Sequence, residues 1–285
     1  MKNFAVYLHH DLKDSRQVHK LLLDLKNTYG ISFLGDTEQK EILPDFVKCH
    51  KVKAGAFPSV DCLLVFGGDG TILRAKNLAL ATSAPILGIN LGYLGFLSES
   101  SLSEIRASIQ DLLNGKYKLL SRMLLSCQLR RRGKVVYKGL ALNDAVIYKA
   151  ETPRLIHVRI FNDRRFVFDT RCDGVVASTP TGSTAYSLAA GGPILAPEMQ
   201  AIVLTPLNPH LLSIRPMVFS SNDHILMKVH NLTEPACLQI DGVNVARMEE
   251  LDELSITASG SCVDFVKLSN RTFYQILRNK LHLGK

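Results

Sequence analysis

The chain has 285 residues, of which 46% are hydrophobic and 21% charged, and its formal net charge is +8. This composition is typical of a globular protein with one or two domains, and it excludes a disordered or fibrous chain. The first apolar run is too short for a signal peptide and no stretch reaches transmembrane length, so we expect a cytoplasmic protein with no membrane partner. The basic residues are dispersed along the chain, so the positive charge suits anionic small molecules at least as well as nucleic acid, and we expect no nucleic-acid partner.

The cysteines and histidines are scattered. The six cysteines form no Cys-x-x-Cys pair, and several lie in apolar stretches, so we expect small core residues in a reducing compartment. The nine histidines show no spacing of the His-x-x-x-His kind. On this argument we expect neither a disulfide framework nor a transition-metal site.

The first part of the chain alternates strand and helix patterns. In chain order these are expected at residues 3–8, 14–29, 60–66, 71–82, 84–90 and 103–113, with Ser103 as a possible N-cap. Residues 30–57 show no clear pattern. Such alternation predicts a parallel sheet with crossover helices, an α/β fold of the Rossmann-like kind.

From about residue 119 the pattern changes to short segments rich in Val, Ile, Phe and Tyr, separated by turn signals. The strands are expected at residues 134–148, 155–161, 165–169, 174–178, 201–204, 225–230, 236–241 and 253–267. The basic run at 130–134 is predicted to be a solvated hairpin turn, and helical spacing returns at 271–283. We therefore expect an α/β domain at residues 1–118, completed by a helix within 266–285, and a mainly β domain at 119–265.

A hydrophobic strand at residues 60–66 runs into Gly67-Gly68-Asp69-Gly70-Thr71. Glycines permit positive φ and let another molecule approach the backbone, while the acidic side chain stands at the carboxyl end of the strand. The amides of the helix that follows would face a phosphate over this turn. The spacing is neither that of a Walker A loop nor that of the dinucleotide fingerprint, and an ordinary tight turn remains an alternative.

A second loop, residues 172–186, is denser in polar groups and closes with Gly191-Gly192-Pro193. Its hydroxyl side chains are Ser178, Thr179, Thr181, Ser183 and Thr184. Hydroxyls together with backbone amides suit phosphate oxygens, although a structural turn rich in Ser and Thr is the alternative.

Three further signals are weaker. Asn143-Asp144 interrupts an apolar strand, so one of the two side chains is expected inside, where ribose hydroxyls would satisfy it; a bulge or turn is the alternative. Asp241-Gly242 is either part of the same site or a hairpin turn. Phe96, in the glycine loop at residues 91–97, is either an apolar wall for a heterocycle or a core anchor.

Taken together, these motifs resemble the NAD kinases in their order and spacing, from about residue 60 to the tail. The resemblance implies transfer of a phosphoryl group from ATP, or from polyphosphate, to NAD, giving NADP. It also implies that the first domain binds nucleotide and the second binds NAD. Mg²⁺ or another divalent cation would enter with ATP, and the protein would be a homo-oligomer, either dimer or tetramer.

The resemblance also implies residue roles. Asp69 would be the catalytic aspartate that accepts the proton of the adenosine ribose 2′-hydroxyl, with Gly68 and Gly70 lining the nucleotide phosphates. Arg171 could influence the choice between NAD and NADH. The remaining positions that match substrate-binding positions or motif residues of the family are Phe96, Asn143, Asp144, Asp173, Thr181, Thr184, Ala185, Tyr186 and Asp241.

Two positions depart from the family pattern. Asp144 stands where the family usually has Glu, and Ala189 where many members have Ser. Two other functions remain open on the sequence: a lipid kinase of the diacylglycerol or sphingosine class, which carries a similar glycine turn, and a catalytically silent dinucleotide-binding sensor.

Overall fold

The structure is a computed structural model that describes residues 1–10, 12, 15–53, 55–92, 95–150, 154–232 and 235–282. It divides into two compact units. Unit 1 contains Met1–Ser121 and Val263–Lys285, and unit 2 contains Arg122–Cys262. Unit 1 is α/β and unit 2 is mainly β, which confirms the predicted fold class.

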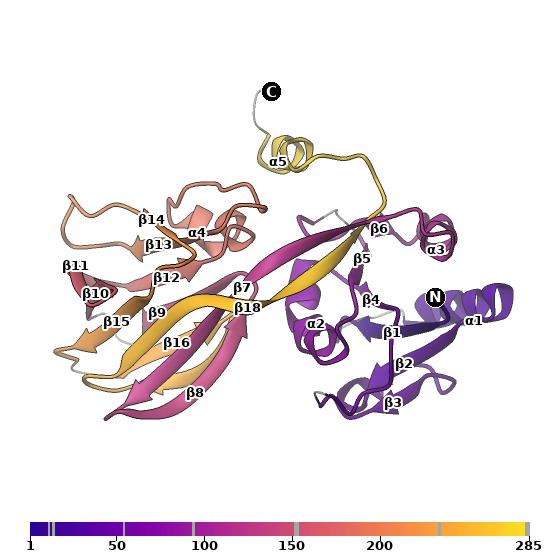
Figure 1. Cartoon of the computed structure of the whole chain (residues 1–285), viewed down its shortest axis with the longest axis horizontal. Helices are drawn as coiled ribbons and strands as arrows, with labels where there is room; N and C mark the ends of the chain where they lie inside the picture. Colours follow the sequence, from indigo (N-terminus) through magenta and orange to yellow (C-terminus); the bar gives the residue numbers. More distant parts are fainter. Residues whose placement is uncertain are drawn as a thin grey trace. The chain divides into compact units, whose positions relative to one another are not determined.

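Unit 1 is built on a parallel sheet with the strand order β3-β2-β1-β4-β5, and the end of β18 pairs with β5 (Figure 1). The buried β1 and β4 lie in its middle, so each needs cover on both faces. The elements of unit 1 are β1 Asn3–Leu8, α1 Ser15–Tyr29, β2 Ser32–Asp36, the 3-10 helix η1 Thr37–Gln39, β3 Lys48–His50, β4 Cys62–Phe66, α2 Asp69–Thr82, β5 Ile86–Asn90, β6 Ser100–Ser101, α3 Ile105–Leu113 and α5 Phe273–Leu281.

Helices cover both faces of this sheet. Alternate side chains of β1 and β4 pack with α1 and α3 in one buried cluster, and α2 contacts the same two strands through other side chains. Helix α2 begins at Asp69, two residues earlier than predicted. The expected Ser103 cap of α3 is wrong: Glu104 is the N-cap residue, and the Ser103 hydroxyl bonds to that of Ser101.

The stretch without a clear pattern contains two short strands, β2 and β3. They are too short for a periodic signal, since β3 has only three residues. The tail helix α5 is closed at its start by a capping box between Thr272 and Gln275. Leu283, at the end of the predicted helix, lies outside the described residues. No helix that the structure describes combines the length and apolar character needed to cross a membrane.

Unit 2 is formed by two antiparallel sheets packed face to face around one core, to which strands of both contribute. One sheet has the order β11-β10-β15-β18 with β7 and β8 beyond it, and the other has the order β14-β13-β12-β9-β16-β17. The elements are β7 Lys118–Arg131, β8 Lys134–Ala141, β9 Asp144–Lys149, β10 Ile156–Asn162, β11 Arg165–Cys172, β12 Gly174–Ser178, the 3-10 helix η2 Gly182–Thr184, α4 Tyr186–Ala189, β13 Ala201–Leu207, β14 Met217–Ser220, β15 Ile225–His230, β16 Ala236–Ile240, β17 Val243–Met248 and β18 Glu253–Lys267.

Unit 2 differs from the prediction in three ways. The strand expected at 134–148 is two strands, because the chain turns at Leu142 and Asn143. The predicted strands included none at 118–131, where β7 lies. Strands β14 and β17 were not predicted either. Both are edge strands with mostly exposed side chains, so they lack the apolar alternation that marks a half-buried strand.

The basic hairpin turn at 130–134 is confirmed, with Arg132 and Gly133 at positive φ between β7 and β8. It is not wholly solvated, however. The Arg131 guanidinium donates through Nε and Nη2 to Asp252, at 3.0 and 2.8 Å, and the Glu249 amide donates to the same carboxylate at 2.9 Å. Asp252 is fully buried, so these bonds hold a charge inside unit 2.

We expect Asp252→Ala to lower the free energy of unfolding by about 3 kcal/mol, because Arg131 and the Glu249 amide lose a buried acceptor. The matched control is Glu249→Gln. Glu249 also pairs with Arg131, at 2.8 Å, but its side chain is 56% exposed, so its loss should cost less than about 1 kcal/mol. Urea unfolding followed by circular dichroism measures both, and equal effects of the two substitutions would contradict the assignment.

Candidate functional site

In unit 1 the Asp69 side chain joins the two glycine loops. Its Oδ2 accepts the Phe96 amide at 2.8 Å and its Oδ1 accepts the Leu97 amide at 3.1 Å. Asp69 is the first residue of α2 and is half-buried. The carboxylate therefore lies at the positive end of a helix with both oxygens held by backbone amides.

Glycines make this arrangement possible. A Cβ on Gly95 would overlap the Asp69 carboxylate, and a Cβ on Gly67 would overlap Thr71. Gly68 and Gly70 are exposed, with open space where a Cβ would stand, so another molecule can reach the backbone beside Asp69. Phe96 is half-buried. Its loop neighbours Tyr93 and Leu94 lie outside the described residues.

In unit 2 the Asn143-Asp144 turn is organised by Asp241. The Asp241 carboxylate accepts the backbone amides of Leu142, Asn143 and Asp144 at 2.9, 2.7 and 3.2 Å. The amides lose ladder partners where the chain turns between β8 and β9, and the carboxylate replaces those partners. Asn143 and Asp144 are both buried, at 8% and 5% exposure, so the expectation that only one lies inside is wrong.

Asp241 itself lies at positive φ, with Gly242, in the two-residue turn between β16 and β17. The hairpin interpretation of Asp241-Gly242 is therefore confirmed, and the same turn lies beside the Asn143-Asp144 motif. Its position beside residues 142–144 follows from the pairing of β16 with β9.

The hydroxyl-rich loop packs directly on the Asn143 turn. The Thr179 amide donates to the Asn143 carbonyl at 2.8 Å, and the Thr179 hydroxyl donates to the Leu142 carbonyl at 2.6 Å. At Gly182 a Cβ would overlap the Asn143 backbone. The two sequence motifs thus form one cluster in unit 2.

This cluster contains buried oxygen atoms without a partner. Among the residues that the structure describes, Asn143 Oδ1, Ser178 Oγ and Thr181 Oγ1 are buried and make no hydrogen bond. Ser178 pairs with Asp144 across β12 and β9. Unpartnered buried polar atoms are uncommon in folded proteins, so this set fits a ligand that carries hydroxyl or amino groups. Ser178 is among the hydroxyls of the second loop that the sequence singled out, but it was not among the positions matched to the family.

A cavity of about 460 Å³ in unit 2 brings together Asp173 and Tyr186, with Ala189 at its wall. The Asp173 carboxylate accepts Lys149 Nζ at 2.6 Å and Asn208 Nδ2 at 2.8 Å. The bonds from Lys149 and Asn208 hold the pKa of Asp173 below its usual range, so it stays ionised. Lys149 and Asn208 had no motif around them and could not be found from the sequence.

Three predicted residues remain. The Thr184 hydroxyl donates to the Thr181 carbonyl at 3.3 Å. Thr184 ends η2 and Ala185 precedes α4, and both are half-buried. Arg171 is exposed on β11, two residues before Asp173. The structure thus gathers Asn143, Asp144, Thr181 and Asp241 in one cluster of unit 2, whereas Asp69, Gly68, Gly70 and Phe96 belong to unit 1.

Comparison with known proteins adds independent evidence. Residues 17–117 match the family described as ATP-NAD kinase N-terminal domain, and residues 142–268 match the ATP-NAD kinase C-terminal domain. An NAD kinase of Desulforamulus reducens is 40% identical over 221 residues, covering 78% of this chain and 77% of that protein. An NAD kinase of Carboxydothermus hydrogenoformans is 39% identical over 257 residues, covering 90% and 88%.

Two solved structures are similar over almost the whole chain. Yeast NADH kinase complexed with NADH has a TM-score of 0.84 and 27% identity, covering 99% of this chain and 87% of that one. An NAD kinase from Archaeoglobus fulgidus in complex with ATP has a TM-score of 0.69 and covers 98% of both chains; at 23% identity it supports the fold alone. With both domains matched in order and relatives near 40% identity over most of its length, the chain belongs to the NAD kinase family.

Proposed function

We propose that this protein is an NAD kinase that transfers the γ-phosphoryl group of ATP to the adenosine ribose 2′-hydroxyl of NAD, giving NADP. The observation that carries the proposal is the Asp69 carboxylate, fixed at the start of α2 between two glycine loops whose backbone is open. Membership of the NAD kinase family supports the same reaction.

Asp69 supplies the proton acceptor. Each of its oxygens accepts one backbone amide, and a carboxylate oxygen has a further lone pair for a sugar hydroxyl. A carboxylate is a weak base toward an alcohol, so the proton moves late, as the bond from O2′ to phosphorus forms and the bond from phosphorus to the β-phosphate oxygen breaks. Asp69 also orients the hydroxyl for in-line attack, which is the larger part of catalysis in reactions of this kind.

In unit 2 the unpartnered oxygens of Asn143, Ser178 and Thr181 are the groups we assign to NAD hydroxyls and amino groups. Asp144 is one methylene shorter than the usual Glu, which shortens its reach, so its contact with the ribose is direct, through water or absent. Asp241 has a different role, since its carboxylate already binds three backbone amides: it positions the turn.

The cavity beside Asp173 and Tyr186 suits a flat ring, because Tyr186 is 44% exposed and the Asp173 carboxylate is held by Lys149. We assign it to one of the two bases of NAD, with Ala189 at the wall where a serine would add a hydrogen bond. Thr184 and Ala185 precede Tyr186 in the sequence, and we assign them to the same base of NAD.

Mg²⁺ arrives with the phosphate donor in this scheme. Asp69 is the acidic side chain of the glycine turn, and each of its carboxylate oxygens already accepts a backbone amide. Most ligands of the magnesium ion would therefore come from phosphates and water. The ion supplies charge neutralisation for the transferring group.

We further infer a cytoplasmic homo-oligomer that uses ATP or polyphosphate. Light scattering measures the oligomeric state, and a comparison of ATP with polyphosphate as substrates identifies the phosphate donor. The kinetics of Arg171→His with NAD and with NADH test whether Arg171 influences the preference between these two substrates.

Asp69→Asn should lower kcat by at least about 10³-fold, within the range attributed to general acid–base catalysis, with little change in NAD affinity. The purified protein is incubated with NAD, ATP and Mg²⁺, and NADP is read with an NADP-specific dehydrogenase. Calorimetry measures NAD binding to the same samples.

The matched control is Asp61→Asn. Asp61 precedes the same strand β4 and likewise accepts two backbone amides, those of Lys2 and Asn3, at 2.6 and 2.9 Å. Turnover should persist in this variant. Wild-type turnover in Asp69→Asn would remove Asp69 from the mechanism, and NAD binding by the wild type without any NADP would indicate the silent sensor.

Asn143→Ala should raise KM for NAD about 5- to 30-fold, the equivalent of the 1–2 kcal/mol that a lost hydrogen bond to a buried group costs. The control is Asn162→Ala, because Asn162 Oδ1 is also buried and unpartnered but lies on β10, away from the Asn143 cluster. An unchanged KM in Asn143→Ala, or an equal rise in both variants, would contradict the assignment.

A further inference from the structure

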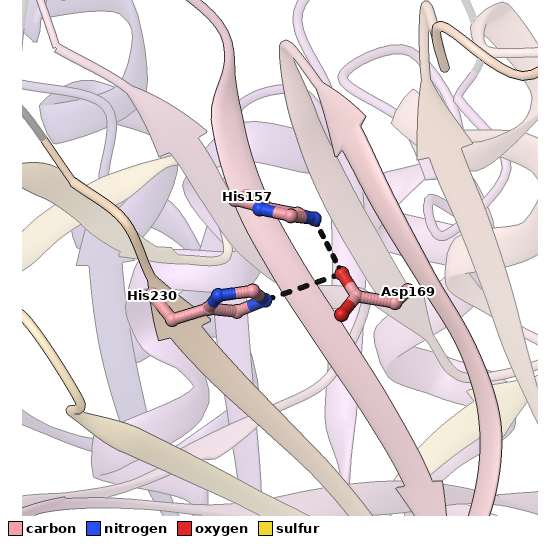
Figure 2. Close-up of side chains that lie close together, drawn as sticks. All are labelled: His157, Asp169 and His230. Atoms are coloured by element: carbon pink, nitrogen blue, oxygen red, sulfur yellow. Dashed lines mark hydrogen bonds and ion pairs between the residues drawn. The ribbon is translucent and has the colours of Figure 1, made fainter.

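Three titratable side chains converge on the outer face of a unit 2 sheet, outside the groups assigned to NAD (Figure 2). His157 comes from β10, Asp169 from β11 and His230 from β15. The Nε2 atoms of both histidines point at the same carboxylate oxygen, Asp169 Oδ1, at 2.6 and 3.2 Å. The imidazole rings lie against each other with their centroids 3.9 Å apart.

Strand pairing explains the convergence. His157 is directly opposite His230 in the pairing of β10 with β15, and Asp169 is opposite Arg159 in the pairing of β10 with β11. The alternate residues of β10, such as Val158, are buried in the core, so this set faces away from the core. The three side chains are nevertheless only 13–21% exposed. They form a half-buried, preassembled group.

We propose that His157, Asp169 and His230 bind a divalent transition-metal ion, with Zn²⁺ as the best fit, through Nε2, Oδ1 and Nε2. The three ligand atoms lie within 4.8 Å of one another. Ligands of tetrahedral Zn²⁺ at about 2.0–2.1 Å are about 3.3 Å apart. The ion would replace the two contacts between Nε2 and Oδ1, and the Asp169 carboxylate would withdraw to make room for it. Two imidazoles favour Zn²⁺, Co²⁺ or Ni²⁺ over Mg²⁺ and Ca²⁺, which prefer oxygen ligands.

The neighbouring groups support the ligands. Arg159 donates to the other carboxylate oxygen, Asp169 Oδ2, at 2.9 and 2.8 Å, which orients the carboxylate and leaves Oδ1 toward the histidines. The Asn231 amide lies 3.4 Å from His157 Nδ1. With the amide oxygen turned to this position it accepts the Nδ1 proton, which is the tautomer that coordination through Nε2 requires.

Arg159 also sets a limit on the site. Its charge offsets that of Asp169, so the two imidazoles rather than net negative charge must provide the affinity. We therefore expect micromolar binding of Zn²⁺ and no response to Mg²⁺. A bound ion would join β10, β11 and β15, of which β11 is an edge strand, and would stabilise unit 2 by mass action.

The test is Zn²⁺ titration of the chelator-treated full chain, by calorimetry and by thermal unfolding. We expect one ion per chain and a rise in the unfolding midpoint that Mg²⁺ does not produce. Asp169→Asn and the double variant His157→Asn, His230→Asn should weaken binding at least about 100-fold. His224→Asn is the control: His224 lies beside β15 but bonds to Ser255, so binding should persist.

Co²⁺ absorption gives a second test that needs no variant. A four- or five-coordinate nitrogen and oxygen site has strong d–d bands without thiolate charge transfer. The spectrum of hydrated Co²⁺, a thiolate band from one of the free cysteines, or Zn²⁺ binding that the double variant retains would each overturn the proposal. In that case the cluster is a hydrogen-bond network in which both histidines donate to Asp169.

Discussion

Backbone amides outside a strand ladder must find another acceptor, and in both units an aspartate provides it. Asp69 accepts the amides of Phe96 and Leu97, and Asp241 accepts those of residues 142–144. Each bond joins segments that are distant in the sequence. The geometry of the candidate site residues in each unit depends on these charge-assisted bonds, because each bond fixes a loop against another segment of the same unit.

The two aspartates nevertheless serve different purposes in the proposed reaction. Asp69 is half-buried beside exposed glycines, so a substrate hydroxyl can reach its remaining lone pairs. Asp241 binds three amides in a hairpin turn and acts through the residues that it positions. The oxygens left for a substrate in unit 2 belong to its neighbours, among them Asn143 and Thr181. A motif aspartate therefore need not itself touch the substrate.

Sequence patterns predicted several buried or half-buried strands well and the exposed edge strands poorly. The buried strand β4 and the strands β12 and β15 have strong apolar signals, and their positions are close to those predicted. The edge strands β14 and β17 were missed, because exposed side chains carry little periodic signal. The site roles of Asp69 and Asn143 rest on resemblance and on local geometry, and they stay predictions.

The sequence by itself determined the fold class, the order of the motifs and the family, since these depend on local periodicity, glycine placement and residue spacing. Only the tertiary structure decided which side chains meet. Ser178 joins the Asn143 cluster, Lys149 holds Asp173, and two histidines converge on Asp169 through strand pairing. Contacts of this kind depend on the pairing register between strands that are far apart in the chain. The spacing of residues along one strand does not encode that register.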